Sequence, residues 1–232
     1  MPVSAPLSEE ALTALRQFDT CTIANAIEKF QIRLRNTGFT NASVHCRFPH
    51  AGPMLGYAVT ARLRTEDPPI TGFAFHNRTD FWNAIQRVPR PSVLVLEDMD
   101  PHPGRGAFVG DVHAAILKAL GCVGHVTNGA VREVPSVGRM GLQLFSGNLA
   151  VSHAYAHIYD VGSPVEVGGM EVHAGDLLHG DLHGVLNIPL EIAAEVPGVA
   201  STVRSAEQRV IDFCSSSEFS VSKLSEITKT VE

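Results

Sequence analysis

The middle of the chain alternates short apolar runs with an amphipathic stretch, and this rhythm restricts the fold more than any other feature. Apolar runs occupy Ser92–Glu97, Cys122–Thr127 and Leu142–Phe145, and a helical pattern at Asp111–Leu120 separates the first two. Short apolar runs indicate buried strands, and their alternation with helices is typical of parallel α/β structure. The sequence therefore predicts an α/β fold with a mixed or parallel sheet core and flanking helices.

The ends of the helix predicted at Asp111–Leu120 are marked by their residue types. Asp111 is the expected N-cap, and Gly121 is the expected C-terminal stop. Its expected apolar face comprises Val112, Ala115, Ile116, Ala119 and Leu120. Further helices are expected after Ser8 and over 22–30 and 135–140, a strand over 57–63, and loops over 98–110 and 128–133.

The C-terminal part has a different texture. A β-hairpin is expected around Gly168-Gly169, followed by short strands within 175–181 and 184–189. Helices are expected over 190–195 and 201–213, and the polar tail after Ser215 is expected to fray. We expect one domain over 1–232, with an N-terminal helix within 1–19 and a C-terminal helical extension over 196–232.

Composition excludes several classes of protein. Hydrophobic residues make up 44% and charged residues 18%, which predicts a folded globular protein, and the net charge of −6 argues against a nucleic-acid surface. No apolar run approaches the roughly 18–20 residues that span a bilayer, and the N-terminus has no apolar signal core. Four widely spaced cysteines without a C-x-x-C pair predict free thiols in a reducing cytoplasm. We thus expect a cytoplasmic protein with no membrane or nucleic-acid partner.

Two loops carry the candidate chemistry. At Gly110-Asp111-Val112-His113, a helix start presents unpaired N–H groups and a partial positive charge, which suit a carboxylate. In Asn128-Gly-Ala-Val-Arg132-Glu133, Arg132 can bind a carboxylate through two hydrogen bonds, and Glu133 can hold a divalent cation. Each motif also has a purely structural interpretation, as a capped helix start and as a turn with a surface ion pair.

Two further patterns are weaker. The Gly- and Asp-rich run from Gly175 to Pro189 is expected at the same edge of the sheet as these loops, where its residues form tight turns. The pairs His153–His157 and His179–His183 have a spacing that aligns on a helix, but neither has the H-E-x-x-H form of a zinc site. We expect packed or surface histidines. No G-x-G-x-x-G follows a strand, which argues against a dinucleotide site.

The order of these motifs resembles the RraA-like family, which includes 4-hydroxy-4-methyl-2-oxoglutarate aldolases and the RraA regulators of ribonuclease E. The resemblance runs from about Thr20 to Glu195. It rests on Gly110-Asp111, GCVGHV from Gly121, NGAVRE from Asn128, PVEVGG from Pro164, and the Gly175–Pro189 run.

This resemblance implies a swivelling β/β/α-type fold, assembled as a homotrimer or hexamer with the site near a subunit interface. In the family aldolases the Gly-Asp loop and helix start hold pyruvate, the loop Arg contacts it, and the next acidic residue anchors magnesium or manganese. Carried over by motif, the substrate-binding residues are Gly110, Asp111, Val112, His113 and Arg132, and the ligand of Mg²⁺ or Mn²⁺ is Glu133.

The chain departs from the family pattern at three positions. The family usually has Asp where Glu133 stands, and its aldolases commonly have Asp where Asn128 stands. Glu reaches one methylene further, so the ion is expected to sit differently or to bind more weakly. The lost charge at Asn128 is expected to alter substrate or proton handling. His113 replaces an apolar residue, and it either contacts a distal group of the substrate or packs as a neutral side chain.

The resemblance implies a divalent-metal-dependent lyase that cleaves a 4-hydroxy-2-oxo acid to pyruvate. The cation and Arg132 would stabilise the enolate, and Asp111 would accept the 4-hydroxyl proton directly or through water. Decarboxylation of oxaloacetate passes through the same enolate and is expected as well. The alternative is a non-catalytic regulator that acts by protein–protein binding.

Overall fold

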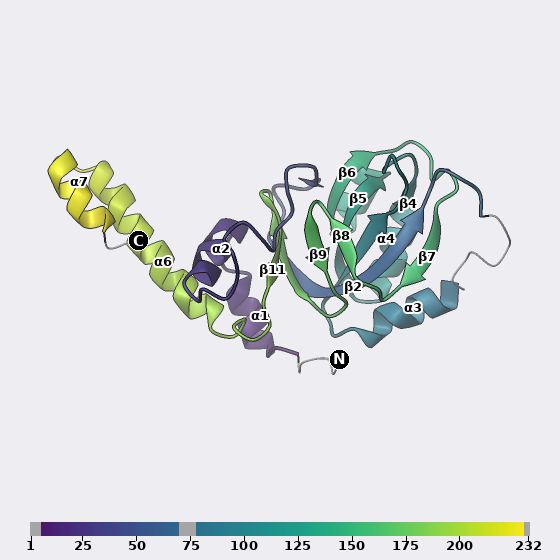
Figure 1. Cartoon of the computed structure of the whole chain (residues 1–232), viewed down its shortest axis with the longest axis horizontal. Helices are drawn as coiled ribbons and strands as arrows, with labels where there is room; N and C mark the ends of the chain where they lie inside the picture. Colours follow the sequence, from purple (N-terminus) through teal and green to yellow (C-terminus); the bar gives the residue numbers. More distant parts are fainter. Residues whose placement is uncertain (1–5, 70–77, 230–232) are drawn as a thin grey trace.

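A nine-stranded mixed sheet forms the centre of the molecule, in a computed structural model that describes residues 6–69 and 78–229 (Figure 1). Its order is β1-β6-β5-β3-β2-β10-β11, with β4 added beside β5 and β7 beside β2. Five strands pair in parallel with one another, which confirms the predicted parallel core. They are β2 (Met54–Arg64), β3 (Ser92–Asp98), β4 (Ala107–Val109), β5 (Cys122–Val131) and β6 (Gln143–Leu149).

The remaining strands are antiparallel to their neighbours. In the large sheet these are β1 (His45–Cys46), β7 (His157–Val161), β10 (Leu177–Asp181) and β11 (Gly184–Ile188). A separate hairpin pairs β8 (Val165–Val167) with β9 (Met170–Val172). Its turn is Gly168-Gly169, with φ of 59° and 76°, so the predicted hairpin is confirmed.

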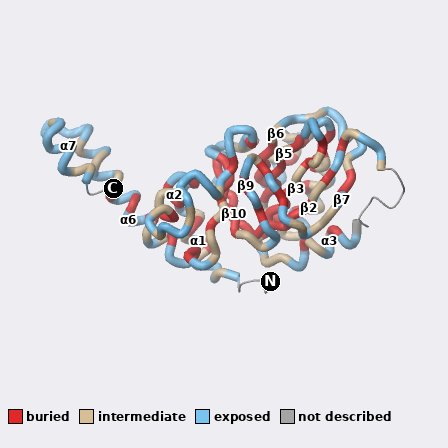
Figure 2. Tube along the Cα trace, in the orientation of Figure 1, coloured by how far each residue is buried: buried red, intermediate tan, exposed pale blue. Residues whose placement is uncertain are grey.

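Three layers result from the packing on the two faces of the sheet. One face carries α3 (Arg78–Arg87), α4 (Asp111–Ala119) and α5 (Val134–Arg139) over a core of aliphatic and aromatic side chains. The β8–β9 hairpin covers the other face, where its inward Val and Met side chains form a second core with the strands. Figure 2 shows the buried residues concentrated along these strands. This hairpin–sheet–helix order agrees with the expected β/β/α layering.

A third core lies at the β10–β11 side of the sheet. There α1 (Glu9–Leu15), α2 (Thr20–Glu28) and α6 (Val196–Cys214) pack together against strand residues. The last helix, α7 (Val221–Thr228), buries none of its residues and extends with the second half of α6 away from the body (Figure 1). None of the helices within residues 6–69 and 78–229 is sufficiently long and apolar to cross a membrane.

The predicted helix at Asp111–Leu120 exists, but two of its details are wrong. Gly110 occupies the N-cap position, and no side chain caps this helix start. The buried residues of α4 are Ala114 and Leu117, whereas Val112 on the predicted apolar face is 68% exposed. The cause is that Ala114 faces the sheet and the larger apolar side chains partly face a pocket.

Three boundaries also differ from expectation. Strand β5 continues to Val131 instead of ending at Thr127, because it pairs with β4 and, after a register shift, with β6. Residues 190–195 form turns, and the helix expected at 201–213 begins earlier, at Val196. The tail expected to fray contains α7, whose N-cap Ser220 accepts a hydrogen bond from Lys223 N.

Candidate active site

The parallel neighbours β4 and β5 end side by side, so the two candidate loops that follow them lie next to each other. The strands pair at Val109↔Val131, and Arg132 N donates a hydrogen bond of 3.1 Å to Val109 O. Gly110 and Arg132 therefore start adjacent loops at the same edge of the sheet, as predicted. The Gly175–Pro189 run does not join them. It forms β10 and β11 on the far side of β2, because this hairpin pairs antiparallel with that strand.

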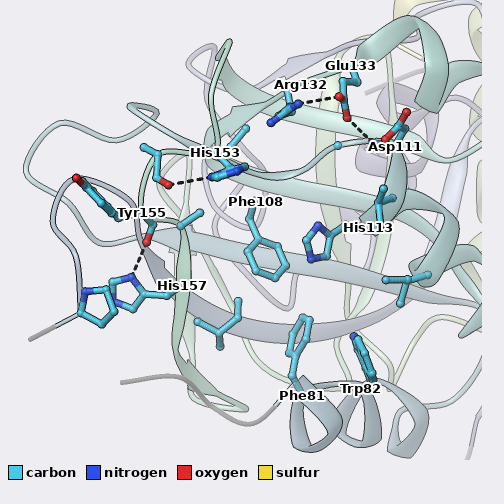
Figure 3. A pocket seen from close by; sticks show the side chains of 18 residues that line it. Phe81, Trp82, Phe108, Asp111, His113, Arg132, Glu133, His153, Tyr155 and His157 are labelled. Carbon is cyan, nitrogen blue, oxygen red and sulfur yellow. Dashed lines mark hydrogen bonds and ion pairs between the residues drawn. The ribbon is translucent and has the colours of Figure 1, made fainter. Parts of the chain in front are cut away.

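A cavity of 660 Å³ opens between these loops, α3 and the segment before β7 (Figure 3). All six residues that the sequence assigned to substrate or metal line it: Gly110, Asp111, Val112, His113, Arg132 and Glu133. Their common location supports the sequence-based grouping, while their roles stay predictions. The lining also includes aromatic and histidine residues that the sequence did not assign, which are described below.

Glu133 has an unusual backbone and a fully engaged carboxylate. Its φ of 54° and ψ of 31° place it in the left-handed region, between the end of β5 and the start of α5. Its Oε2 accepts from Asp111 N at 3.0 Å, and its Oε1 accepts from Arg132 Nη2 at 2.7 Å. These two hydrogen bonds hold the pKa of Glu133 below its ordinary value. The Glu133 carboxylate thus occupies the helix start that the sequence assigned to the substrate's carboxylate.

This close approach depends on Gly110. A Cβ at that position would clash with Glu133 Oε2 and lie 3.1 Å from Arg132 Cγ. Within the described part of the chain, the buried Nε–H of Arg132 has no hydrogen-bond acceptor. The guanidinium therefore keeps an unused donor, in addition to the Nη2 group that is now directed at Glu133.

Asp111 stands at the first position of α4 without capping the helix. Ser136 Oγ donates to its Oδ2 over 3.4 Å, and the side chain lines the cavity. We call Asp111, Arg132 and Glu133 the polar corner. In the described residues no set of three or more His, Cys, Asp or Glu side chains is arranged to hold a metal. Two carboxylates still suit Mg²⁺ or Mn²⁺, since Mg²⁺ takes one or two carboxylates and completes its shell with water and substrate oxygens.

Asn128 lies apart from the cavity and has a structural environment. Its Oδ1 accepts from Asp98 N at 2.7 Å, and its Nδ2 donates to Asp98 O at 3.0 Å. These bonds join β5 to the end of β3 where the β5–β6 register shifts. Asn128 thus clamps two strands together, and the expected effect of its lost charge on substrate or proton handling stays a prediction. An aspartate would lack the donor that reaches Asp98 O.

An apolar surface faces the polar corner across the cavity. Phe81 and Trp82 come from α3, Phe108 from β4 and Ile116 from α4, and we call these four residues the aromatic wall. Phe81 meets Phe108 edge-to-face with ring centroids 5.9 Å apart. The segment 66–82 contributes Pro69, Phe81 and Trp82 to the lining, while its residues 70–77 lie outside the described residues.

Three histidines complete the lining. The His113 ring lies 4.4 Å from the Phe108 ring, centroid to centroid, so His113 both packs and faces the cavity. His153 directly precedes the turn at Ala154 and Tyr155, and His157 starts β7, so the two do not lie on a helix. Their Nδ1 atoms bond to the carbonyl oxygens of Ala154 and Tyr155, at 2.9 and 2.7 Å. A carbonyl only accepts, so the Nδ1 atom of each ring donates in these bonds.

Comparison with known proteins connects this geometry to a family. A family model described as RraA-like, Aldolase/RraA, matches residues 20–186. Protein DlpA of Legionella pneumophila is 28% identical over 143 residues, which are 60% of this chain and 22% of that protein. A Halalkalibacterium halodurans protein, provisionally named a 4-hydroxy-4-methyl-2-oxoglutarate aldolase, is 31% identical over 84 residues, which are 36% of this chain and 40% of that protein. The matches thus span less than half of either relative.

Solved structures share the fold. An uncharacterized protein from Pseudomonas syringae pv. tomato has a TM-score of 0.75 and 23% identity, over 99% of this chain and 97% of that one. RraAS2 of Streptomyces coelicolor, described as an unusual member of the RNase ES inhibitor RraA family, has a TM-score of 0.68 and 20% identity, over 88% and 97%. At these identities the likeness establishes the mixed α/β architecture.

Proposed function

The chain belongs to the RraA-like family, and on that premise we propose that it is a divalent-metal-dependent lyase. Its reaction is the cleavage of a 4-hydroxy-2-oxo acid to pyruvate, with decarboxylation of oxaloacetate as a second activity. One observation carries the proposal. Arg132, whose buried Nε–H has no acceptor among the described residues, meets two carboxylates and a helix start inside a 660 Å³ cavity.

Binding begins with an exchange of carboxylates. The carboxylate of the 2-oxo acid takes the place of the Glu133 carboxylate, accepting hydrogen bonds from Arg132 and from the N–H groups at the start of α4. Glu133 is exposed enough to move, since its side chain is 36% accessible. Glu133, once displaced, would hold Mg²⁺ or Mn²⁺. The bound cation would supply Lewis-acid polarisation of the 2-oxo group.

Two groups of the chain serve the bond cleavage itself. Asp111 lines the cavity with a carboxylate that caps no helix, so it is available to accept the proton of the 4-hydroxyl group. Arg132 places fixed positive charge beside the oxygen that becomes negative as the carbon–carbon bond breaks. Oxaloacetate needs no such base, because carbon dioxide leaves without a hydroxyl proton.

The test is release of pyruvate by purified protein with Mg²⁺ or Mn²⁺ from oxaloacetate and from 4-hydroxy-2-oxoglutarate. Arg132→Ala is expected to lower kcat/KM by about 100-fold or more, the usual cost of removing a charge-stabilising donor. Arg105→Ala is the matched control, since Arg105 is exposed and pairs only with Glu66 in the described structure. Folded, metal-loaded protein without pyruvate release, or full activity in Arg132→Ala, would overturn the proposal.

The second candidate is a regulator that acts by binding another protein. The internal pairing of Glu133 with Arg132 and Asp111 N favours it, because that pairing leaves the helix start satisfied without a ligand. The family description covers both aldolases and RraA proteins. Metal-independent binding of a protein partner, with no turnover of any 2-oxo acid, is the outcome that selects this candidate.

We also propose that the chain assembles as a homotrimer or hexamer. Apolar side chains near the cavity support this, because Val112 and Tyr155 line it and are 68% and 55% exposed, and Val151 nearby is 97% exposed. Burial of such side chains at an interface is favourable. Light scattering should give three or six times the chain mass of 24.9 kDa, and a monomer would contradict the assembly.

A further inference from the structure

We propose that the aromatic wall binds an aryl substituent on C4 of the substrate, so that the preferred substrates are 4-aryl-4-hydroxy-2-oxo acids and not acids with a second carboxylate. This inference rests on the proposed function of the same cavity. It concerns Phe81, Trp82, Phe108 and Ile116, which the polar corner does not use.

The first argument is size. A cavity of 660 Å³ is in the range of about 300–1,000 Å³ that accommodates drug-sized ligands, and pyruvate alone has only three carbons. Figure 3 shows the polar corner at one end of the cavity, Phe81 and Trp82 at the other, and Phe108 and His113 between them. A 2-oxo acid held by Arg132 therefore directs its C4 substituent toward the aromatic wall.

The second argument is charge. Among the described residues that line the cavity, Arg132 is the sole Lys or Arg, and the first carboxylate of the substrate uses it. A second carboxylate beside Phe81, Trp82 and Ile116 would lose water and meet no Lys or Arg among the described lining residues, which is costly. Asp111 and Glu133 add negative charge to the same cavity and disfavour a second anion further.

The third argument is the geometry of the rings. Phe108 contacts Phe81 edge-to-face and His113 at an interplanar angle of 35°, so the wall already holds its rings in mutual contact. Edge-to-face and offset stacking are favourable for a further ring that enters. Phe81 is 3% exposed and belongs to the core over α3, so the wall is preformed.

The reaction of such a substrate balances without a further reagent. The C3–C4 bond breaks, the 4-hydroxyl proton passes to Asp111, and C4 leaves as the carbonyl carbon of an aryl aldehyde. The electron pair of the broken bond forms the pyruvate enolate, which takes a proton at C3. The substrate 4-hydroxy-2-oxo-4-phenylbutanoate would thus give pyruvate and benzaldehyde.

Binding can be measured apart from catalysis, because Trp82 is the single tryptophan of the chain and lines the cavity. Its fluorescence therefore reports directly on this site. The probes are 2-oxo-4-phenylbutanoate and 2-oxoglutarate, which differ only by phenyl in place of carboxylate and lack the hydroxyl needed for cleavage. We expect the phenyl compound to change Trp82 emission and to bind at least about tenfold more tightly.

Turnover should also be faster for the phenyl substrate than for the dicarboxylic substrate. The ratio of kcat/KM for 4-hydroxy-2-oxo-4-phenylbutanoate over that for 4-hydroxy-2-oxoglutarate should exceed about ten. Ile116→Lys, which introduces a cation beside the wall, should lower this ratio at least about tenfold. Trp82→Ala should lower it without adding charge, and it serves if Ile116→Lys does not fold. Phe219→Ala is the control and should leave the ratio unchanged, since this ring is exposed beyond α6.

The outcomes separate the two proposals. Decarboxylation of oxaloacetate together with tighter binding or faster cleavage of the dicarboxylic compounds would overturn the aryl site and leave the lyase intact. Selective binding of the phenyl compound without pyruvate release from any substrate would support the aryl site and remove the lyase. An unchanged ratio in both Ile116→Lys and Trp82→Ala would overturn the assignment of the aromatic wall.

Discussion

The Arg132 and Glu133 side chains, between β5 and α5, are 28% and 36% accessible, whereas Phe81 across the same cavity is 3% exposed. The polar corner is held by hydrogen bonds among neighbouring loops. The aromatic wall is shared with the core between the sheet and α3. The two sides of the cavity therefore differ in what a substitution disturbs. A change in the polar corner alters charge, while a change in the aromatic wall alters packing as well.

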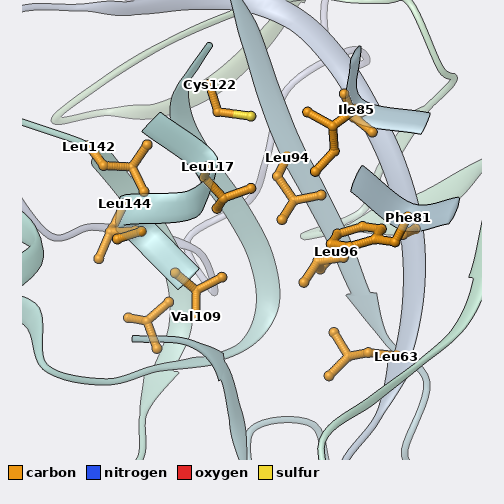
Figure 4. Packing of buried hydrophobic residues seen from close by; sticks show 14 of the residues in the cluster. Leu63, Phe81, Ile85, Leu94, Leu96, Val109, Leu117, Cys122, Leu142 and Leu144 are labelled. Carbon is orange, nitrogen blue, oxygen red and sulfur yellow. The ribbon is translucent and has the colours of Figure 1, made fainter. Parts of the chain in front are cut away.

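The largest effect on stability should come from the aromatic wall. Phe81→Ala is expected to lower the free energy of unfolding by about 3–5 kcal/mol, because it leaves a cavity beside Leu63, Leu96 and Ile85 (Figure 4). Arg132→Ala should cost less than about 1 kcal/mol, since the guanidinium is partly exposed. Urea unfolding of both variants gives the comparison. Equal losses of unfolding free energy in the two variants would contradict the difference in packing between the two sides of the cavity.

A smaller loss of stability is expected when the Asn128–Asp98 hydrogen bonds, which clamp β5 to β3, are weakened. Asn128→Asp keeps an acceptor for Asp98 N and loses the donor to Asp98 O, so it should cost about 1–3 kcal/mol. Burial raises the pKa of the neighbouring Asp98 carboxyl to about 6, and a second carboxylate nearby adds repulsion. Asn83→Asp, at an exposed position of α3, is the control. If urea unfolding gives both variants the same free energy of unfolding, the Asn128 clamp does not contribute to stability.

The smallest predicted effect is the difference in melting temperature between two variants of Glu133. Glu133→Ala removes the acceptor for Asp111 N but keeps a side chain at φ 54°, whereas Glu133→Gly removes the acceptor and suits that φ. Both variants should melt below the unsubstituted protein, with Glu133→Gly about 2 °C above Glu133→Ala. Scanning calorimetry measures this difference. The reverse order would mean that the left-handed conformation does not persist without the carboxylate.

The sequence predicted the polar corner because its residues lie next to strand ends. Gly110 and Arg132 were expected together because their loops follow the runs at 92–97 and 122–127, and parallel neighbours end at one edge. The short strand β4, which directly precedes Gly110, was not expected. That pattern does not predict the hydrogen bond from Asp111 N to the Glu133 carboxylate or the left-handed backbone of Glu133. Asp111 also matched the N-cap rule, but the chain begins the helix one residue earlier and leaves its carboxylate to the cavity.

The aromatic wall was beyond such reasoning for a physical reason. Phe81 and Trp82 come from a helix about 25–50 residues before the loops that they face, and only the packing of α3 on the sheet brings them there. The contact of Asn128 was not foreseen for a similar reason, since its partner Asp98 belongs to a strand 30 residues earlier. Local spacing thus predicts elements and loops, while contacts between distant elements depend on the folded structure.

The arm formed by the second half of α6 and by α7 lies at the opposite end of the molecule from α3 and β7, which border the cavity (Figure 1). It carries Cys214, which with Cys21 is one of two exposed thiols. With Cys21 replaced by serine, a maleimide linker at Cys214 would tether the protein to a sensor surface by a single point. The cavity would then face the flowing solution, and the arm would serve as a natural spacer for measurements on immobilised protein.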